Sequence, residues 1–86
     1  MFEIKKDRIG AALEVIPNNS LNLSMTSTEK KLIGIGYQSI VLSPFMLVVK
    51  REEEFTIFPS GKIVVSSSLD KIKLKELATE IYQVIG

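Results

Sequence analysis

Two short apolar runs on either side of a tight turn constrain the fold of this chain most. Residues 55–58 and 63–66 flank a Pro-Ser-Gly turn at 59–61. β-Branched and aromatic residues on both sides of such a turn are typical of a β-hairpin. An amphipathic stretch at 69–82 follows almost at once and predicts a helix. The C-terminal half is therefore expected to be a hairpin covered by a long helix.

Length and composition indicate one globular domain. The chain has 86 residues, of which 45% are hydrophobic and 24% charged, which is ordinary for a globular protein. No apolar run reaches membrane-spanning length, and the first eight residues carry charges of both signs, unlike a signal peptide. Cysteine is absent, so no disulfide or thiolate site is expected. We expect a cytoplasmic protein that makes no membrane contact.

The inventory of reactive side chains argues against catalysis. The chain has no histidine, cysteine or tryptophan. Its densest acidic cluster, residues 52–54, lies beside Lys50 and Arg51 and is interpreted as a solvated turn rather than a metal or acid–base site. Gly34 and Gly36 lack the third glycine of a phosphate-binding loop. We expect no enzyme activity, no cofactor and no metal.

The charge balance also bears on nucleic-acid binding. Eleven basic residues face ten acidic ones, a net charge of +1. Dedicated nucleic-acid binders are usually more basic. Strong nonspecific binding of DNA by a single copy is therefore not expected. The charge balance does not exclude DNA binding through a locally basic or apolar surface.

The N-terminal segment leaves two structures open. Ile9, Ala12, Leu13 and Ile16 have the spacing of a short helix that Pro17 would end. Gly10 weakens this prediction, and an extended segment is nearly as compatible. Residues 1–16 are treated as an extension of undetermined structure, and residues 17–86 as the domain proper.

A strict alternation at 20–25 predicts the first strand of that domain. Apolar Leu21, Leu23 and Met25 alternate with polar residues, which predicts a half-buried strand whose other face carries Asn and Ser. A capping box at Thr26 and Glu29 then predicts a helix at about 27–34.

The remaining elements follow from similar patterns. Residues 37–42 are expected to be extended, and the apolar run 45–50 predicts a central strand. Ser66, Ser67 and Ser68 are N-cap candidates for the closing helix, with Asp70 near its positive end. The inward residues of the two helices are expected to be Leu32, Ile33, Leu69, Ile72, Leu77, Ile81, Val84 and Ile85.

The order of these elements predicts an α+β fold. It comprises a curved antiparallel sheet of four to five strands, with two helices packed on one face. Phe55 and Ile57 have one parity and Thr56 and Phe58 the other, and both pairs cannot face the core. We expect Phe55 and Ile57 to pack beneath the closing helix and Phe58 to be at least partly exposed on the opposite face. The other sheet face is either solvated or is the working surface.

The hairpin sequence IFPSGKIVVSS resembles the segment that closes each repeat of the TATA-binding protein family. The resemblance covers about residues 17–86 and is most specific at 57–58 and 60–65. It implies one repeat of a fold that occurs twice in that family, where two repeats form a saddle on the DNA minor groove and phenylalanines wedge between base steps.

The resemblance implies roles for individual residues. Phe58 matches one wedging phenylalanine; its partner is taken as Phe45, with Leu42 or Ser43 as alternatives because the hairpin here is shorter. Lys62 matches a phosphate-contacting lysine, and Asn18 an asparagine that reaches minor-groove acceptors. The full set of implied DNA contacts is Asn18, Ser20, Phe45, Thr56, Phe58, Lys62, Val64 and Ser66.

A single repeat also implies partners. The strand at 20–25 would have an unpaired edge, so a homodimer through that edge is expected. Double-stranded DNA and transcription proteins are the other implied partners. The alternative is a protein-interaction or regulatory domain that keeps the fold without binding DNA.

Overall fold

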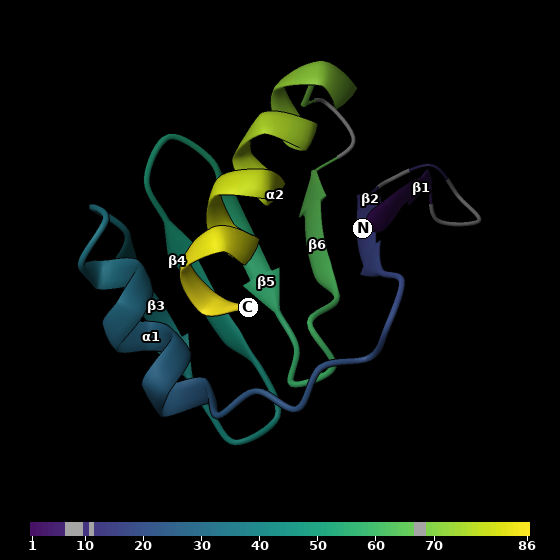
Figure 1. Cartoon of the computed structure of the whole chain (residues 1–86). Helices are drawn as coiled ribbons and strands as arrows, with labels where there is room; N and C mark the ends of the chain where they lie inside the picture. The colour runs from purple at the N-terminus through teal and green to yellow at the C-terminus, as the bar shows by residue number, and fades with distance from the viewer. Residues whose placement is uncertain (7–9, 11, 67–68) are drawn as a thin grey trace.

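The computed structural model describes residues 1–6, 10, 12–66 and 69–86, and its elements are shown in Figure 1. They comprise six strands and two helices. The strands are β1 (Phe2–Lys6), β2 (Ala12–Pro17), β3 (Gln38–Leu42), β4 (Leu47–Lys50), β5 (Glu54–Ile57) and β6 (Ile63–Ser66), and the helices are α1 (Met25–Ile33) and α2 (Lys71–Ile85).

The strands form one antiparallel sheet in the order β1-β2-β6-β5-β4-β3. Both helices lie on the same face of this sheet, and α1 packs against β3, β4 and α2 (Figure 1). The α+β class and the one-sided helices are confirmed. The sheet has six strands rather than four to five, because the N-terminal segment contributes a hairpin. No helix in the described part of the chain is long and apolar enough to cross a membrane.

Strand alternation decides which side chains form the core. Leu13, Val15, Phe55, Ile57 and Ile63 are each at most 1% exposed and point toward the helices. The predicted parity of Phe55 and Ile57 is therefore confirmed. At about 25 cal/mol per Å² of apolar area removed from water, such inward rows supply most of the driving force for folding.

The N-terminal segment is a hairpin, and a helix at 12–16 is wrong. Leu13 and Val15 are buried while Glu14 is only half-buried, which is a period of two. β2 pairs with β1 on one side and with β6 on the other. The extended alternative is correct for residues 12–17, because pairing with β6 provides hydrogen-bond partners for the backbone groups of β2. Ile9, also part of the helical pattern, lies outside the described residues.

The predicted strand at 20–25 is also wrong. This segment runs past the turn at 59–61 without joining the sheet. The amide of Leu21 donates to the carbonyl of Ser60 at 2.8 Å, and the amide of Leu23 donates to that of Pro59 at 2.9 Å. Its alternation has another cause, because Leu21 and Leu23 half-bury themselves against the core and Met25 is buried at the start of α1.

Helix α1 begins two residues earlier than the capping box at Thr26 predicts. Ser24 is the N-cap and accepts from the amide of Ser27 at 3.3 Å. The Thr28 hydroxyl donates to the Ser24 carbonyl at 2.8 Å, which explains why this polar residue is buried. Leu32 is buried as predicted, whereas Ile33 is 50% exposed and its predicted inward position is wrong.

Helix α2 is capped by Asp70, whose carboxylate accepts from the amide of Ile72 at 2.9 Å. Of the serine candidates, Ser67 and Ser68 lie outside the described residues. Ile72 is 72% exposed, so its predicted inward position is wrong. Ile81 and Ile85 are buried as predicted. Three further predicted residues are only partly buried: Leu69, Leu77 and Val84. The buried residues of α2 are Leu74, Ala78, Ile81, Tyr82 and Ile85.

The turn between β5 and β6 is held from two sides. Gly61 has φ +94°, and its amide donates to the carbonyl of Phe58 at 2.8 Å. The Tyr82 hydroxyl of α2 donates to the Gly61 carbonyl at 2.6 Å. A Cβ on Gly61 would lie 2.8 Å from a methyl carbon of Leu21, so only glycine fits both the backbone angle and the space.

Gly61→Ala should therefore destabilise the protein by about 3 kcal/mol or more in a urea titration. The left-handed backbone costs an L-residue roughly 1–2 kcal/mol, and the clash with Leu21 adds to it. Gly36→Ala is the matched control, because Gly36 has φ +98° but its Cβ would meet only an ordinary contact at 3.5 Å from Arg51. Equal losses for the two variants would contradict the close approach at Gly61.

Burial raises the pKa of Tyr82 to about 12 and also raises the pKa of Tyr37. The folded state thus holds these protons at a pH at which the unfolded chain releases them. Tyr82 should contribute full stability below pH 10, and that stability should be lost as the pH rises through about 12. The loss for Tyr82 is about 2–3 kcal/mol.

Unfolding at a series of pH values checks this, with Tyr82→Phe as the variant that should lose less stability over that window. Phenolate absorbance gives a second reading, because the chain has two tyrosines. Titration of both near pH 10 in the folded protein would show that neither hydroxyl is buried as described.

Candidate functional site

The sheet face turned away from both helices, called the outer face below, carries the candidate site. The strand registers align one side chain from each strand into a single row. Read from β3 to β1, the row is Val41, Val48, Thr56, Val64, Glu14 and Lys5. Its first four residues are apolar apart from the Thr56 hydroxyl, and its last two, Glu14 and Lys5, are charged.

Lys62 lies beside this row and is already engaged. Its Nζ is 4.9 Å from the centroid of the Phe58 ring and 3.8 Å from Oε1 of Glu14. The Lys62 side chain is 39% exposed and that of Glu14 29%. A half-exposed pair of this kind contributes little to stability. It does reduce the positive charge that the outer face can offer to a phosphate.

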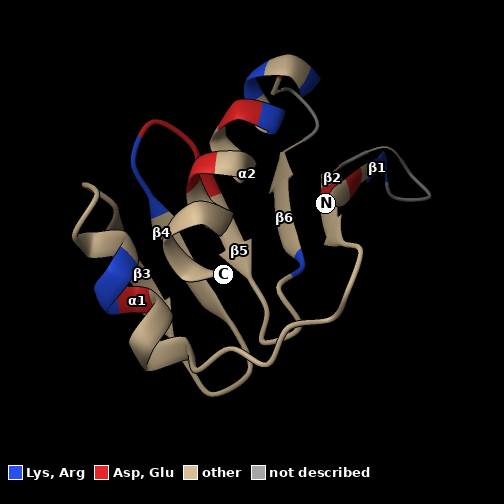
Figure 2. Cartoon of the chain, in the orientation of Figure 1, with Lys and Arg blue, Asp and Glu red and all other residues tan. Residues whose placement is uncertain are grey.

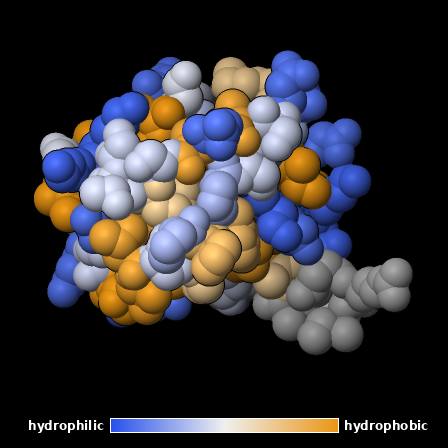
Figure 3. All heavy atoms as spheres, turned by 90° about the horizontal axis from the view of Figure 1, so that it is seen from below, coloured by the Kyte–Doolittle hydropathy of each residue, from blue (hydrophilic) through white to orange (hydrophobic). Residues whose placement is uncertain are grey.

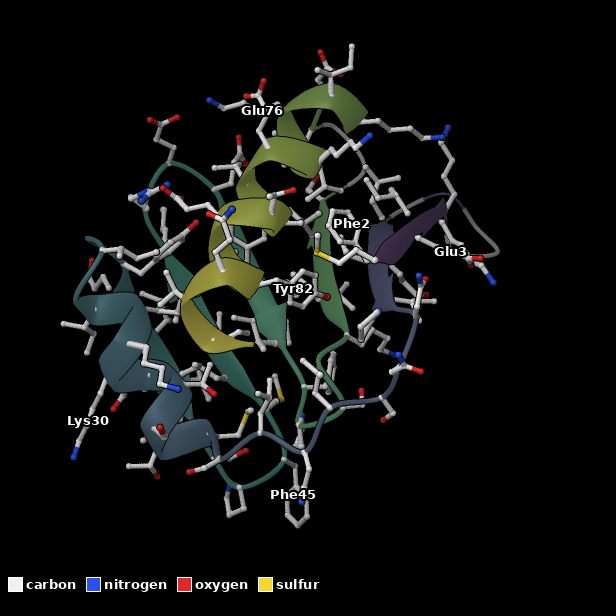
Figure 4. All side chains as sticks on the ribbon, in the orientation of Figure 1. Phe2, Glu3, Lys30, Phe45, Glu76 and Tyr82 are labelled. Atoms are coloured by element: carbon white, nitrogen blue, oxygen red, sulfur yellow. The ribbon has the colours of Figure 1, made fainter. Side chains whose placement is uncertain are left out.

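Phe45 is the most exposed aromatic side chain of the described chain, at 79%. It lies in the turn between β3 and β4, which is ordered by Ser43: the amides of Phe45 and Met46 donate to Ser43 Oγ at 3.2 and 3.1 Å. In Figure 4, Phe45 points away from the protein at the end opposite Glu76. The turn thus orders the backbone from which this exposed aromatic ring extends.

Phe45 and Phe58 lie at the same end of the sheet. Leu47 of β4 pairs with Ile57 of β5. Phe45 comes two residues before Leu47, and Phe58 comes directly after Ile57. Phe58 is half-buried, its ring partly covered by Lys62. The two rings predicted to act together are therefore neighbours in the fold, one exposed and one partly covered.

The end of the molecule that carries Phe45 is nearly free of charge. Residues 17–28, 34–49 and 55–61 contain no charged side chain. Their parts 18–28, 42–47 and 57–61 lie at this end, with Lys62 beside them (Figure 2). Seen from this end, hydrophobic side chains are interspersed with weakly polar ones, and strongly hydrophilic residues lie mainly toward the rim (Figure 3). This end is called the uncharged end below.

The structure brings together most, but not all, of the predicted contact residues. Thr56, Phe58, Lys62, Val64 and Ser66 share the outer face, as their parity predicted. Phe45 extends from the uncharged end next to them.

Asn18 and Ser20 are not on the outer face. Both are exposed in the connection after β2, and the amide of Asn18 donates to the carbonyl of Met1 at 2.9 Å. The strand parity predicted for them is wrong, since no strand forms there. Asn18 and Asn19 instead line a hollow of about 330 Å³ with Met1, Pro17, Leu21, Tyr82 and Gly86.

The sequence prediction missed the contribution of β2 and β3. Glu14 and Ile16 belong to the outer face, and Val41 and Val48 form the apolar end of the row. A signal was present, because Leu13 and Val15 alternate with Glu14 and Ile16. The helical spacing of Ala12, Leu13 and Ile16 competed with it in the same window.

Charged clusters elsewhere have a structural explanation. Arg51 donates to the Ile35 carbonyl at 2.9 Å and to Glu80 at 2.7 Å, and its guanidinium lies 4.5 Å from the centroid of the Tyr37 ring. The hydrogen bond to Glu80 raises the pKa of Arg51. This group ties the turn after β4 to the connection between α1 and β3 and to α2. Among the residues described, no cluster of acidic side chains is arranged to hold a metal ion.

Comparison of the chain with models of known protein families, with curated proteins and with solved structures gave no match. The outer face and the uncharged end are therefore the features of this chain that bear on its function.

Truncating three phenylalanines should give graded losses of stability. Phe55→Ala should cost roughly 3–5 kcal/mol because its ring is 1% exposed, whereas Phe45→Ala should cost close to nothing. The half-buried Phe58 should lie between them, at about 1–2 kcal/mol. Thermal unfolding measures all three. A Phe58→Ala variant as unstable as Phe55→Ala would mean that Phe58 is core and that the outer face is assigned incorrectly.

Proposed function

We propose that this protein is a non-catalytic nucleic-acid-binding module that presents its outer face and uncharged end to the minor groove of double-stranded DNA. The proposal extends the resemblance to one repeat of the TATA-binding protein family. From β2 onward, the element order is strand, short helix, four strands, long helix. The resemblance implies this order, but its first strand was expected at 20–25 and the strand present there in the order is β2, at 12–17. The β1 strand is an addition to it.

The observation that carries the proposal is the placement of Phe45 and Phe58 at one end of the β4–β5 hairpin. A minor-groove protein wedges apolar side chains between base steps, and a wedge must be exposed and held firmly in place. Phe45 meets both conditions through its 79% exposure and the Ser43 hydrogen bonds of its turn. Thr56 and Val64 continue the surface with small, half-buried side chains that permit close approach to base edges, and Val48 packs between them and β3 at 8% exposure.

The charges of the outer face predict weak binding. Lys62 is shared with Glu14, and Glu3 lies on β1 nearby. With few phosphates neutralised, the logarithm of the binding constant should fall by only about 2–3 per tenfold increase in salt. Affinity should depend instead on apolar contact and on how easily the DNA bends, which favours flexible T-A steps.

Fluorescence anisotropy with a labelled A/T-rich duplex tests the proposal. Phe45→Ala should weaken binding about tenfold or more while leaving the unfolding temperature unchanged. Ile72→Ala is the matched control, since Ile72 is also strongly exposed but lies on α2, on the opposite side of the sheet. A minor-groove drug should displace the protein, whereas methylation of the major groove should not.

Two results would reject the proposal. The first is no binding of any duplex at high protein concentration and low salt. The second is binding that Phe45→Ala leaves intact or that the drug does not affect, since either would place the DNA elsewhere on the molecule.

The alternative is a protein-interaction domain with the same fold. The feature that favours it is the ion pair between Lys62 and Glu14, which occupies the basic residue that a DNA-binding face needs most. Failure of the duplex titration together with tight, salt-insensitive association with a protein would favour this function.

A further inference from the structure

The exposed apolar side chains of this protein are concentrated in one stretch of sequence. Seven large hydrophobic residues of the described chain are exposed, and five of them lie between positions 33 and 45. These five are Ile33, Ile40, Val41, Leu42 and Phe45. Scattered exposed apolar residues are normal, but a contiguous group of them marks an interaction surface.

Three of the five belong to β3, which is an edge strand. β3 pairs with β4 on one side only. α1 covers its inner face, where the Ser39 hydroxyl donates to Glu29 Oε2 at 2.6 Å. Ile40, Val41 and Leu42 nevertheless remain 47%, 45% and 43% exposed. The free edge of β3 and its outer face are thus open to solvent.

The two edges of the sheet differ in how they are protected. β1, at the opposite edge, carries Glu3, Lys5 and Lys6, and charged residues are a usual guard against edge-to-edge pairing. β3 has none, and no charged residue occurs from Gly34 to Val49. Its one protective feature is the bulge between Ser39 and Val41, which lies at the centre of the strand and leaves its apolar side chains uncovered.

We infer that β3 pairs antiparallel with β3 of a second copy of this chain, so that two sheets join across a twofold axis. Antiparallel pairing of identical strands is the isologous contact that a C2 dimer requires. An uncharged strand can pair with itself in any register without placing like charges opposite each other, whereas β1 would place lysines opposite each other in a register centred on Lys5 or Lys6. The inference does not depend on DNA binding.

This dimer differs from the one expected through residues 20–25. Residues 20–25 form no strand, and β2 is paired with β6 on one side and with β1 on the other. Neither segment therefore has an open edge that could pair with a second copy. β3 is the uncharged edge that remains. Because β3 is short, the pairing alone buries less area than a standard interface of about 800 Å² per partner. The dimer is therefore expected to be concentration-dependent and to involve Phe45 or Ile33 next to the strand.

Sedimentation equilibrium of the full chain over micromolar to millimolar concentrations tests the inference. The apparent mass should rise toward twice the 9.6 kDa of the monomer. Ile40→Lys should shift the dissociation constant upward at least tenfold, because two lysines would then face each other across the axis. Ile72→Lys makes the same substitution at an exposed site on α2 and should leave the dimer unchanged.

Cross-linking gives a second reading that does not depend on a destabilising charge. The chain has no cysteine, so each single-cysteine variant provides one defined thiol. Under mild oxidation, Ile40→Cys or Leu42→Cys should form covalent dimers, and Ile72→Cys should not.

Three outcomes would overturn the inference. These are a monomer at millimolar concentration, a dimer that survives Ile40→Lys, and cross-linking that is as fast at position 72 as at positions 40 and 42. A monomer whose β3 amides are protected only when an unrelated extended peptide is added would assign the edge to a different occupant.

Discussion

The register of β5 against β6 determines which side chains this protein presents on its outer face. That register depends on the turn at residues 59–61, where Gly61 adopts a backbone angle that other residues disfavour. Segments on both sides of the turn hold it: the Leu21 and Leu23 amides bind its carbonyls, and Tyr82 binds the Gly61 carbonyl from α2. A slip of one residue would exchange Phe55 and Ile57 for Thr56 and Phe58 in the core. The candidate site therefore exists only while this turn holds.

The sequence predicted the parts of the fold that local chemistry determines. The hairpin of β5 and β6 and the inward direction of Phe55 and Ile57 follow from turn residues and a period of two. The two failures at the N-terminal side have a common origin, since a local pattern does not reveal its partner. The alternation at 20–25 arises from packing over a turn rather than from strand pairing. The strand β2 was not predicted because three of its own residues, Ala12, Leu13 and Ile16, also have the spacing of a helix.

The sheet face was predicted correctly for the site residues on β5, β6 and the turn between them, and wrongly for those in the connection after β2. Thr56, Phe58, Val64 and Ser66 share a face because parity alone places them there. Asn18 was placed by resemblance and depended on a strand that does not form. The acidic partner of Lys62 could not be foreseen, because Glu14 meets Lys62 only through the pairing of β2 with β6. The ion pair is the feature that most restrains the proposed DNA contact.

The strand β1 changes what this fold can assemble into. By covering β2 it places charged residues at one edge of the sheet and leaves the uncharged β3 as the open edge. Two copies joined at β3 would bring their outer faces into one extended surface. The apolar ends of the two cross-strand rows, Val41 and Val48 in each copy, would then lie near the axis, and the charged ends would lie outermost.

DNA binding by the outer face is tested most directly by titrating isotope-labelled protein with a short A/T-rich duplex and following the amide chemical shifts. Binding there predicts shifts at Val48, Thr56 and Val64 and in the turn around Phe45, with the exposed face of α2 around Ile72 unchanged. Shifts confined to the helices, or none at saturating duplex, would contradict it.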